Sequence, residues 1–269
     1  MEKKNWFVTG ASRGFGRLWT EAALARGDKV VATARDSGSL ADLTAQYGEA
    51  VLALPLDVTD TDAVFAAVKA GHDHFGRLDV ILSNAGYGML GAVEEVDIKR
   101  ARAIFDTNFF GTLAVIQAAL PQLRAQGSGH ILAVSSLAGL ISFPLGGLYH
   151  ASKYAVVGLA ESLAQEVAPF GIKVTVIEPG PFATEFMGAA SFDIVDPIPA
   201  YLAGRQALLN AFNPEFFADP TATTEFVLRA VDSTEPPVHL LLGPVRAMIE
   251  DAYAARRSDW DAWAAVTGD

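Results

Sequence analysis

Hydrophobic positions fall into two kinds of run that alternate along the chain. Short runs of β-branched and aliphatic residues are almost continuously apolar, which is typical of parallel strands covered on both faces. Longer segments between them carry apolar residues at helical spacing. The short runs predict seven strands, at residues 6–9, 29–34, 51–55, 78–83, 130–135, 173–178 and 239–242. The longer segments predict helices near residues 14–26, 39–47, 61–75, 99–124 and 147–168.

This alternation of strand and helix predicts right-handed β-α-β units, and therefore a doubly wound α/β fold with a seven-stranded parallel sheet and helices on both faces. No linker or repeat interrupts the pattern, so we expect one domain over residues 1–269. The pattern changes only at about 182–217, which is rich in Phe, Ile, Ala and Pro and predicts a loop at the carboxyl edge of the sheet. Residues 244–266 predict a C-terminal helix.

Composition excludes several classes of protein. The chain has 269 residues, of which 51% are hydrophobic and 19% charged, so general disorder is excluded. A formal net charge of −11 repels nucleic acid and anionic membranes, and we expect neither as a partner. The chain has no cysteine, which excludes disulfides and thiolate metal sites, and no metal site is indicated. Because no signal core or uncharged apolar run of ~18 residues is present, we expect a cytoplasmic protein.

A glycine-rich turn follows the first predicted strand, in the run Thr9-Gly10-Ala11-Ser12-Arg13-Gly14-Phe15-Gly16. Glycine permits positive φ and close approach to a ligand, and the helix N-terminus that follows offers free amides to a pyrophosphate. The spacing Gly-x-x-x-Gly-x-Gly differs from the Gly-x-Gly-x-x-Gly dinucleotide fingerprint. On this motif alone, a tight turn without a ligand stays an alternative.

Tyr149 and Lys153 are four residues apart, so a helix places them on one face. A tyrosine pKa lies near 10, and lowering it to about 7 requires about 4 kcal/mol of preference for the phenolate. A cation within about 4–6 Å supplies 1–3 pKa units of this. The pair therefore indicates proton transfer by Tyr149 with a pKa tuned by Lys153. A surface aromatic–cation pair is the alternative when the two residues are considered alone.

These motifs, in this order and spacing, resemble those of the short-chain dehydrogenase/reductase family, in its short, single-domain, NADP(H)-preferring branch. The resemblance covers residues 5–185 motif by motif and implies a Rossmann-type fold. It also implies an enzyme that interconverts an alcohol and a carbonyl by hydride transfer with NAD(P). The motifs that carry it are the glycine turn, Asp57-Val58, Asn84-Ala85-Gly86, Asn108, Ser136, Tyr149, Lys153 and Pro179-Gly180 with Thr184.

The resemblance assigns roles to four catalytic residues. Tyr149 is the general acid/base, and Ser136 hydrogen-bonds the substrate oxygen. Ser135 is the alternative serine, but adjacent strand residues face opposite sides of the sheet, so the two cannot do the same work. Lys153 binds the nicotinamide ribose, and Asn108 holds a water in a proton relay. The cofactor-binding residues are Gly10, Ser12, Arg13, Gly14, Phe15, Gly16, Arg35, Asp57, Val58, Asn84, Ala85, Gly86, Tyr149, Lys153, Pro179, Gly180, Phe182 and Thr184.

The choice between the two nicotinamide cofactors depends on charge near the second strand. Arg13 and Arg35 can bind the 2′-phosphate of NADP(H), whereas an NAD site usually places an acid at the end of this strand. Asp36 complicates this interpretation, because a displacement of one residue would let it serve the ribose. We expect NADP(H), with NAD(H) as a minor or alternative cofactor. By resemblance, Asp57 and Val58 contact the adenine.

The apolar residues of the 182–217 loop predict a hydrophobic ketone, aldehyde or alcohol as substrate. The alternative is a catalytically silent NADP(H)-sensing binding protein on the same fold. The helices near 99–124 and 147–168 resemble those that pair between subunits, which implies a homodimer or homotetramer. Other residues are expected to have no catalytic role. We expect His72, Asp73 and His74 at a solvated helix end, and Glu94, Glu95 and Asp97 at a solvated helix entry. His130 and His150 are expected to be structural or exposed, and Trp260 and Trp263 to be packing residues of the last helix.

Overall fold

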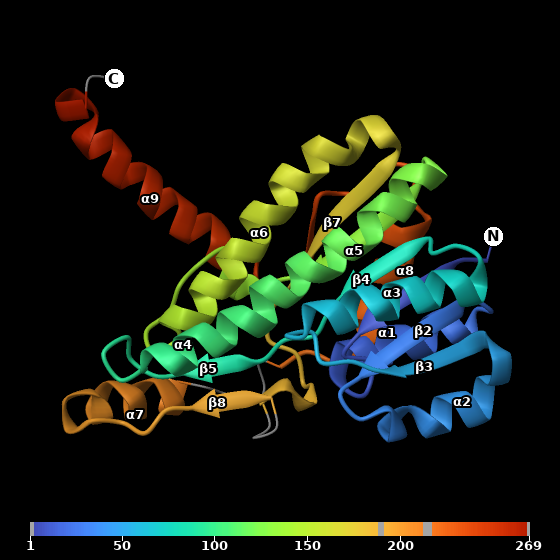
Figure 1. Ribbon diagram of the computed structural model, residues 1–269. Helices are drawn as coiled ribbons and strands as arrows, with labels where there is room; N and C mark the ends of the chain where they lie inside the picture. The colour runs from blue at the N-terminus through green and yellow to red at the C-terminus, as the bar shows by residue number, and fades with distance from the viewer. Residues whose placement is uncertain (1–2, 188–190, 212–216, 268–269) are drawn as a thin grey trace.

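A seven-stranded parallel sheet forms the centre of the computed structural model, which describes residues 3–187, 191–211 and 217–267 (Figure 1). Its strand order, β3-β2-β1-β4-β6-β7-β9, extends in opposite directions from β1 and β4. The predicted doubly wound sheet is therefore confirmed. The strands are β1 (Asn5–Thr9), β2 (Lys29–Ala34), β3 (Val51–Pro55), β4 (Val80–Ser83), β6 (Gly129–Val134), β7 (Ile172–Pro179) and β9 (His239–Leu242).

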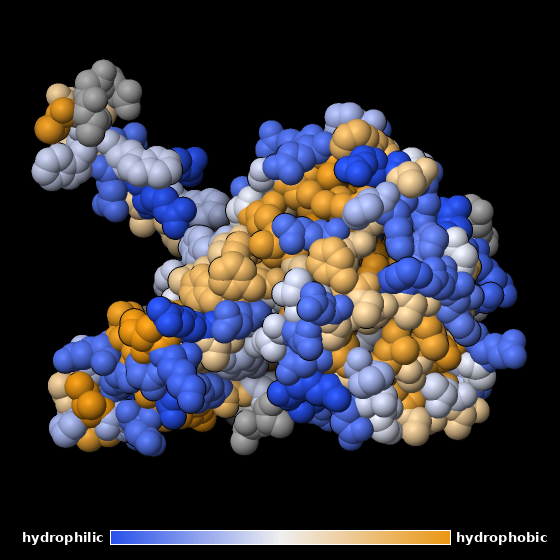
Figure 2. All heavy atoms as spheres, in the orientation of Figure 1, coloured by the Kyte–Doolittle hydropathy of each residue, from blue (hydrophilic) through white to orange (hydrophobic). Residues whose placement is uncertain are grey.

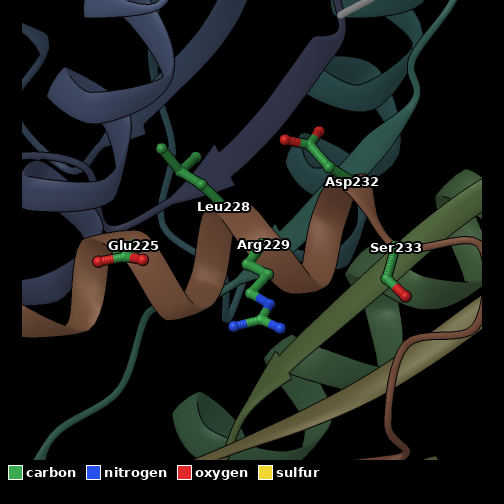
Figure 3. Close-up of a pocket in the computed structure, with 5 residues that line it drawn as sticks. All are labelled: Glu225, Leu228, Arg229, Asp232 and Ser233. Carbon is green, nitrogen blue, oxygen red and sulfur yellow. The ribbon is translucent and has the colours of Figure 1, made fainter.

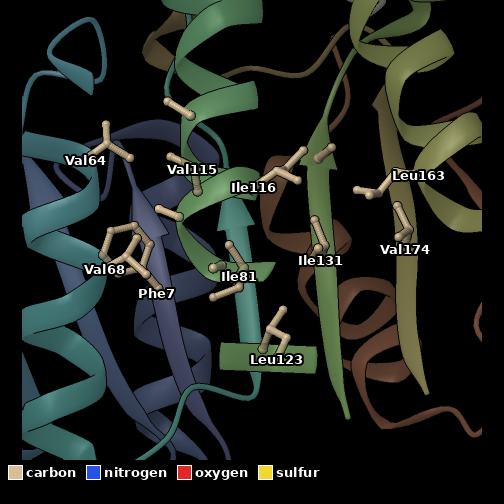
Figure 4. Packing of buried hydrophobic residues seen from close by; sticks show 14 of the residues in the cluster. Phe7, Val64, Val68, Ile81, Val115, Ile116, Leu123, Ile131, Leu163 and Val174 are labelled. Atoms are coloured by element: carbon tan, nitrogen blue, oxygen red, sulfur yellow. The ribbon is translucent and has the colours of Figure 1, made fainter. Parts of the chain in front are cut away.

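Helices cover both faces of the sheet. One layer consists of α3 (Thr61–Phe75), α5 (Gly111–Gln126) and α6 (Gly147–Val167). The other consists of α1 (Gly14–Ala25), α2 (Ala41–Tyr47) and α8 (Thr223–Asp232), the last of which the sequence did not predict. Apolar side chains of the first layer meet those of the strands in a continuous core (Figure 4). Burial of each large aliphatic side chain contributes about 1.5–3 kcal/mol.

The longest helical stretch runs from Ile98 to Gln126 and has three parts. They are α4 (Ile98–Phe105), a π-helical turn (Asp106–Phe110) and α5. By length and composition this stretch could cross a membrane. However, 44% of its most apolar window is buried inside the protein, where α5 packs against α3 and the sheet. Packing of this stretch in the core therefore accounts for its apolar character.

The region from 182 to 217, predicted as a loop, contains regular elements. β8 (Phe192–Ile194) pairs in parallel with β5 (Gly88–Leu90), and α7 (Leu202–Ala211) follows. Residues 188–190 and 212–216 of the predicted loop lie outside the described residues. β5 and β8 are too short to show a periodic pattern of apolar residues in the sequence. Leu202 and Leu209 of α7 are half exposed, so α7 lacks a fully buried apolar stripe.

The predicted C-terminal helix is α9 (Arg246–Thr267), which projects from the body of the molecule (Figures 1 and 2). Its beginning is packed, where Ile249 and the preceding Val245 contact residues 137–141. Trp260 and Trp263 are 64% and 63% exposed, so the expectation that they pack into the structure was wrong. They lie on the projecting part of the helix, beyond the reach of the core.

His130 is the second residue of β6 and is buried, with its Nε2 2.9 Å from Thr175 Oγ1. The Thr175 hydroxyl donates to the carbonyl of Pro237, so it accepts from His130. Burial, together with the charges of Lys173 and Lys4, lowers the pKa of His130 to about 3. The imidazole is therefore neutral in the folded protein throughout the physiological range.

We expect this histidine to make the protein sensitive to acid. Below pH 6.5 the unfolded chain binds a proton that the folded protein does not bind until about pH 3, so the free energy of unfolding falls as the pH falls. The loss between pH 7 and pH 4 is about 3 kcal/mol. His130→Gln should flatten this dependence in urea denaturation at a series of pH values. The exposed control His74→Gln should keep it, and equal slopes in the wild type and His130→Gln would refute the assignment.

Candidate active site

A cavity of about 1360 Å³ opens at the carboxyl ends of the parallel strands. It exceeds the ~300–1000 Å³ typical of a single small-molecule site, so it has room for two ligands side by side. Every predicted cofactor or catalytic residue lines it except Gly16 and Asn108, which lie directly behind its wall. The predicted residues that line it are Gly10, Ser12, Arg13, Gly14, Phe15, Arg35, Asp57, Val58, Asn84, Ala85, Gly86, Ser136, Tyr149, Lys153, Pro179, Gly180, Phe182 and Thr184.

A second, more open depression lies along α8 (Figure 3). Its lining combines two acids, one base and a serine around Leu228, and Asp232 is engaged in an ion pair with Arg26. It lies away from the carboxyl edge of the sheet and from every motif that the sequence analysis identified. We therefore place the candidate active site in the large cavity.

The glycine turn depends on close packing at Gly16. A Cβ atom there would overlap the carbonyl oxygen of Gly10 and the side-chain nitrogen Nδ2 of Asn84. Asn84 Nδ2 donates to the carbonyls of Thr9 (3.0 Å) and Gly10 (3.1 Å), which links β4 to the turn. Gly10 and Gly14 have φ values of 69° and 57°, a region that favours glycine.

The turn forms a cradle that suits an anion. α1 begins at Gly14, and no described side chain caps its N-terminus. Its first amides therefore face the cavity with the positive end of the helix dipole. A dinucleotide pyrophosphate has the charge and the size that this cradle accommodates.

Asn108 lies in the π-helical turn between α4 and α5 and is fully buried. Its side chain accepts from the amide of Tyr87 and donates to the carbonyl of Tyr87, both at 3.0 Å. It also donates to Ser152 Oγ at 3.0 Å. The amide group thus connects the segment after β4 to α6, and π-helical turns often occur at functional sites.

Ser136, Tyr149 and Lys153 meet at the centre of the cavity. Ser136 follows β6, and the other two lie on α6. Lys153 Nζ donates to the carbonyl of Val134 at 3.0 Å and lies 5.9 Å from the centre of the Tyr149 ring. The hydroxyl of Ser136 accepts from the amide of Ala138 at 3.1 Å.

The two serines after β6 have different surroundings. Ser135 Oγ donates to the carbonyl of Lys153 at 3.0 Å. Gly139 leaves room for the Ser135 hydroxyl, because a Cβ atom at position 139 would overlap Ser135 Oγ. Ser135 therefore holds α6 against the strand end. Ser136 instead shares a hydrogen bond with Tyr149.

Burial controls the ionisation of this cluster. It raises the pKa of Tyr149 to about 12, against the lowering effect of the hydrogen bond with Ser136. It lowers the pKa of Lys153 to about 8. Within the protein itself, Lys153 does not bring the Tyr149 pKa towards neutrality as expected from the spacing. The reason is that burial penalises the charged form of both groups.

His150 is a site residue whose role the sequence did not reveal. It is buried, its Nδ1 lies 3.0 Å from the carbonyl of Ala138, and its Nε2 accepts from the amide of Phe143 at 3.2 Å. Burial lowers its pKa, which favours the neutral form that this pattern requires. His150 thus fixes the loop between Ser136 and Tyr149. Its position directly after Tyr149 was the only sequence signal.

At the opposite end of the cavity, Arg35 and Asp36 follow β2. Asp36 Oδ1 accepts from the amide of Gly38 at 2.9 Å and caps the 3-10 turn Ser37–Leu40. One carboxylate oxygen of Asp36 is thereby committed to the backbone. Arg35 is exposed and lines the cavity beside it.

The region around Tyr149 is largely apolar. The Phe186 ring lies 5.9 Å from the Tyr149 ring and contacts Phe192 edge to face. Asp193 adds a carboxylate to this part of the wall. Among the described residues, no group of His, Asp and Glu side chains could hold a metal ion. The apolar lining consists of Met89, Leu90, Phe143, Pro144, Phe186, Phe192, Leu208, Phe217 and Met248.

The chain is similar to known proteins over most of its length. A family model described as short chain dehydrogenase matches residues 4–193. The chain is 43% identical over 244 residues to "Oxidoreductase BOA17" of Botryotinia fuckeliana, covering 90% of this chain and 89% of that protein. It also resembles the crystal structure of a short-chain dehydrogenase from Streptomyces avermitilis, with 37% identity, a TM-score of 0.91, and 99% and 98% of the two chains covered.

Two further solved structures contain a nicotinamide cofactor. One is a short chain dehydrogenase/reductase from Burkholderia phymatum in complex with NAD, with 27% identity, a TM-score of 0.80, and 93% and 92% of the chains covered. The other is a short chain dehydrogenase from Burkholderia cenocepacia in complex with NADP, with 28% identity, a TM-score of 0.77, and 97% of each chain covered.

We expect Gly16→Ala to weaken NAD(P)H binding by about tenfold or more, because the added methyl group must displace Gly10 or Asn84. Titration of NADPH and NADH fluorescence measures this. The matched control is Gly158→Ala in α6, where a Cβ meets nothing within 4 Å. That change should leave binding unaltered and stabilise the helix by up to about 1 kcal/mol. Equal affinity of the Gly16→Ala variant and the wild type would contradict the proposed cradle.

Proposed function

The chain belongs to the short-chain dehydrogenase family and is an oxidoreductase of that type. From this premise we propose that it transfers hydride between NADP(H) and a hydrophobic alcohol or its ketone or aldehyde, with Tyr149 as the general acid/base. The observation that carries the proposal is the meeting of Ser136, Tyr149 and Lys153 in one cavity whose other end is a glycine cradle. The bound nicotinamide supplies or accepts the hydride.

The protein's own contribution is the transfer of a proton and the orientation of the substrate. With a pKa of about 12, Tyr149 keeps its proton at neutral pH and can donate it to a carbonyl oxygen during reduction. Ser136 shares a hydrogen bond with Tyr149, so one substrate oxygen can contact both hydroxyls. Oxidation requires the phenolate, whose formation is favoured by any positive charge brought close to the ring.

Lys153 and Asn108 support this centre from behind. The Lys153 ammonium faces the cavity and, in the proposed role, binds the nicotinamide ribose hydroxyls. Asn108 holds Tyr87 and Ser152 in place, and the proton relay that we propose for it would run along this side of α6. Neither residue needs to contact the substrate for these roles.

Charge at the adenosine end supports a preference for NADP(H). Arg13 and Arg35 both line that end of the cavity, and Asp36 commits an oxygen to the turn that follows it. A 2′-phosphate needs a local cation in a protein with a net charge of −11. The apolar lining around Tyr149 in turn supports a hydrophobic substrate.

The first test is turnover with NADPH, and with NADH in parallel, against a panel of apolar ketones and aldehydes. Tyr149→Phe removes the proton donor and should lower kcat by a factor of about 10² to 10⁴, while cofactor binding persists. Absorbance of the reduced nicotinamide measures both. Cofactor binding without turnover on the whole panel would instead favour a silent, cofactor-sensing protein. Full activity of Tyr149→Phe would refute the assigned acid.

Arg35→Ser should weaken NADPH binding by roughly tenfold and change NADH binding little, because only NADPH carries the 2′-phosphate. Fluorescence titration with both cofactors gives the ratio. The control is Arg246→Ser on α9, an exposed arginine paired with Glu250 outside the cavity. If Arg35→Ser weakens both cofactors equally, Arg35 does not select between them.

A further inference from the structure

Glu95 is a buried carboxylate that the catalytic proposal does not use. It lies between β5 and α4, and its side chain has no exposed surface. The sequence predicted a solvated position for both Glu94 and Glu95. This is correct for Glu94, which is exposed and accepts from Tyr201 Oη, but wrong for Glu95.

Glu95 has a partner for each carboxylate oxygen. Its Oε2 accepts from the amide of Ala92 at 2.8 Å and from Arg205 Nη2 at 3.1 Å. Its Oε1 accepts from the amide of Ile198 at 2.9 Å. These bonds, first that from Ala92 and then those from Ile198 and Arg205, hold the pKa of Glu95 below its usual range despite burial. The carboxylate is thus kept charged opposite the guanidinium.

Arg205 extends the same connection into the segment that covers the cavity. It lies on α7 with only 9% of its side chain exposed, and its Nη1 donates to the carbonyl of Val195 at 2.8 Å. Val195 is buried with Met89 in a small cluster against which Tyr149 packs. Glu95 and Arg205 together therefore tie residues 195–205 to the segment after β5.

The residues that flank this segment on either side, Ser191, Phe192, Asp193 and Leu208, form part of the wall around the reacting centre. β8 is held by its pairing with β5 and by the burial of the following Val195, but the apolar attachment of α7 is sparse, since Leu202 and Leu209 are half exposed. The polar connection through Glu95 is therefore a large share of what fixes its position. The segment after β5 is also connected to the loop between Ser136 and Tyr149, because the amide of Gly91 donates to the carbonyl of Leu145 at 2.7 Å.

We propose that Glu95 and Arg205 are a positioning pair that holds the 192–208 wall in place and thereby sets the affinity for large substrates. This rests on the proposed function. Removing one partner leaves the other as an uncompensated buried charge, which is strongly unfavourable. The segment then moves away from the cavity. A large substrate loses contacts with the wall, whereas a small carbonyl keeps its contacts with Ser136 and Tyr149.

The test uses Glu95→Gln, which preserves shape but removes the charge that faces Arg205. With saturating NADPH, kcat/KM is measured for butanone and for a polycyclic ketone. We expect the loss to be at least roughly tenfold greater for the polycyclic ketone, and to appear mainly in KM. Arg205→Met should reproduce this pattern, and Arg205→Lys, which keeps the charge, should lose less. Glu250→Gln, which removes an exposed carboxylate on α9, is the matched control.

Hydrogen exchange provides a readout that does not depend on activity. In Glu95→Gln, amides of residues 192–211 should exchange at least about tenfold faster, while those of β1, β4 and β6 keep their protection. An unchanged ratio between the two ketones, or faster exchange throughout the sheet, would overturn the proposal. If the wild type reduces no member of the ketone and aldehyde panel, the proposed function fails, and the exchange pattern still decides whether Glu95 anchors the segment.

Discussion

The contact between Gly16 and Asn84 is the constraint on which the arrangement of the site depends. Because Gly16 has no side chain, α1 approaches the end of β1 closely enough for Asn84 to reach the carbonyls of Thr9 and Gly10. This joins β1 to β4, the two strands from which the sheet extends in opposite directions. Ligand sites in such sheets lie at this switch point. The cradle, the end of β6 and the start of α6 then share one cavity.

The sequence predicted the central sheet well, because buried parallel strands are almost continuously apolar and their ends coincide with glycine turns. It also predicted the residues around the cradle and Tyr149, whose motifs are local. It missed α8 and the regular elements of 182–217, and it misjudged Glu95. Besides the nearby Ala92, the partners of Glu95 are Ile198 and Arg205, 103 and 110 positions away along the chain, so its burial has no local signal. The role of His150 likewise depends on a loop that folds back onto it.

The reacting centre shows why distance alone does not determine a pKa. A spacing of four positions places Tyr149 and Lys153 on one helix face, yet the two side chains are buried together. Burial raises the pKa of the phenol to about 12 and lowers that of the ammonium to about 8. The protein alone therefore favours the neutral phenol, which is a proton donor. With a ligand bound, the balance between phenol and phenolate depends on the charge that enters with the ligand, since each added positive charge shifts it towards phenolate.

The two ends of the cavity are built by different means. The cradle rests on strand ends and on glycine positions where any side chain would clash, so it tolerates little change. The wall near Tyr149 comes from short elements that are held by a buried ion pair, amide hydrogen bonds and the first turns of α9. Local polar connections can be altered without disturbing the sheet, because the sheet core does not contain them. A chain built in this way can change the wall near Tyr149 while it keeps the cradle and the position of Tyr149.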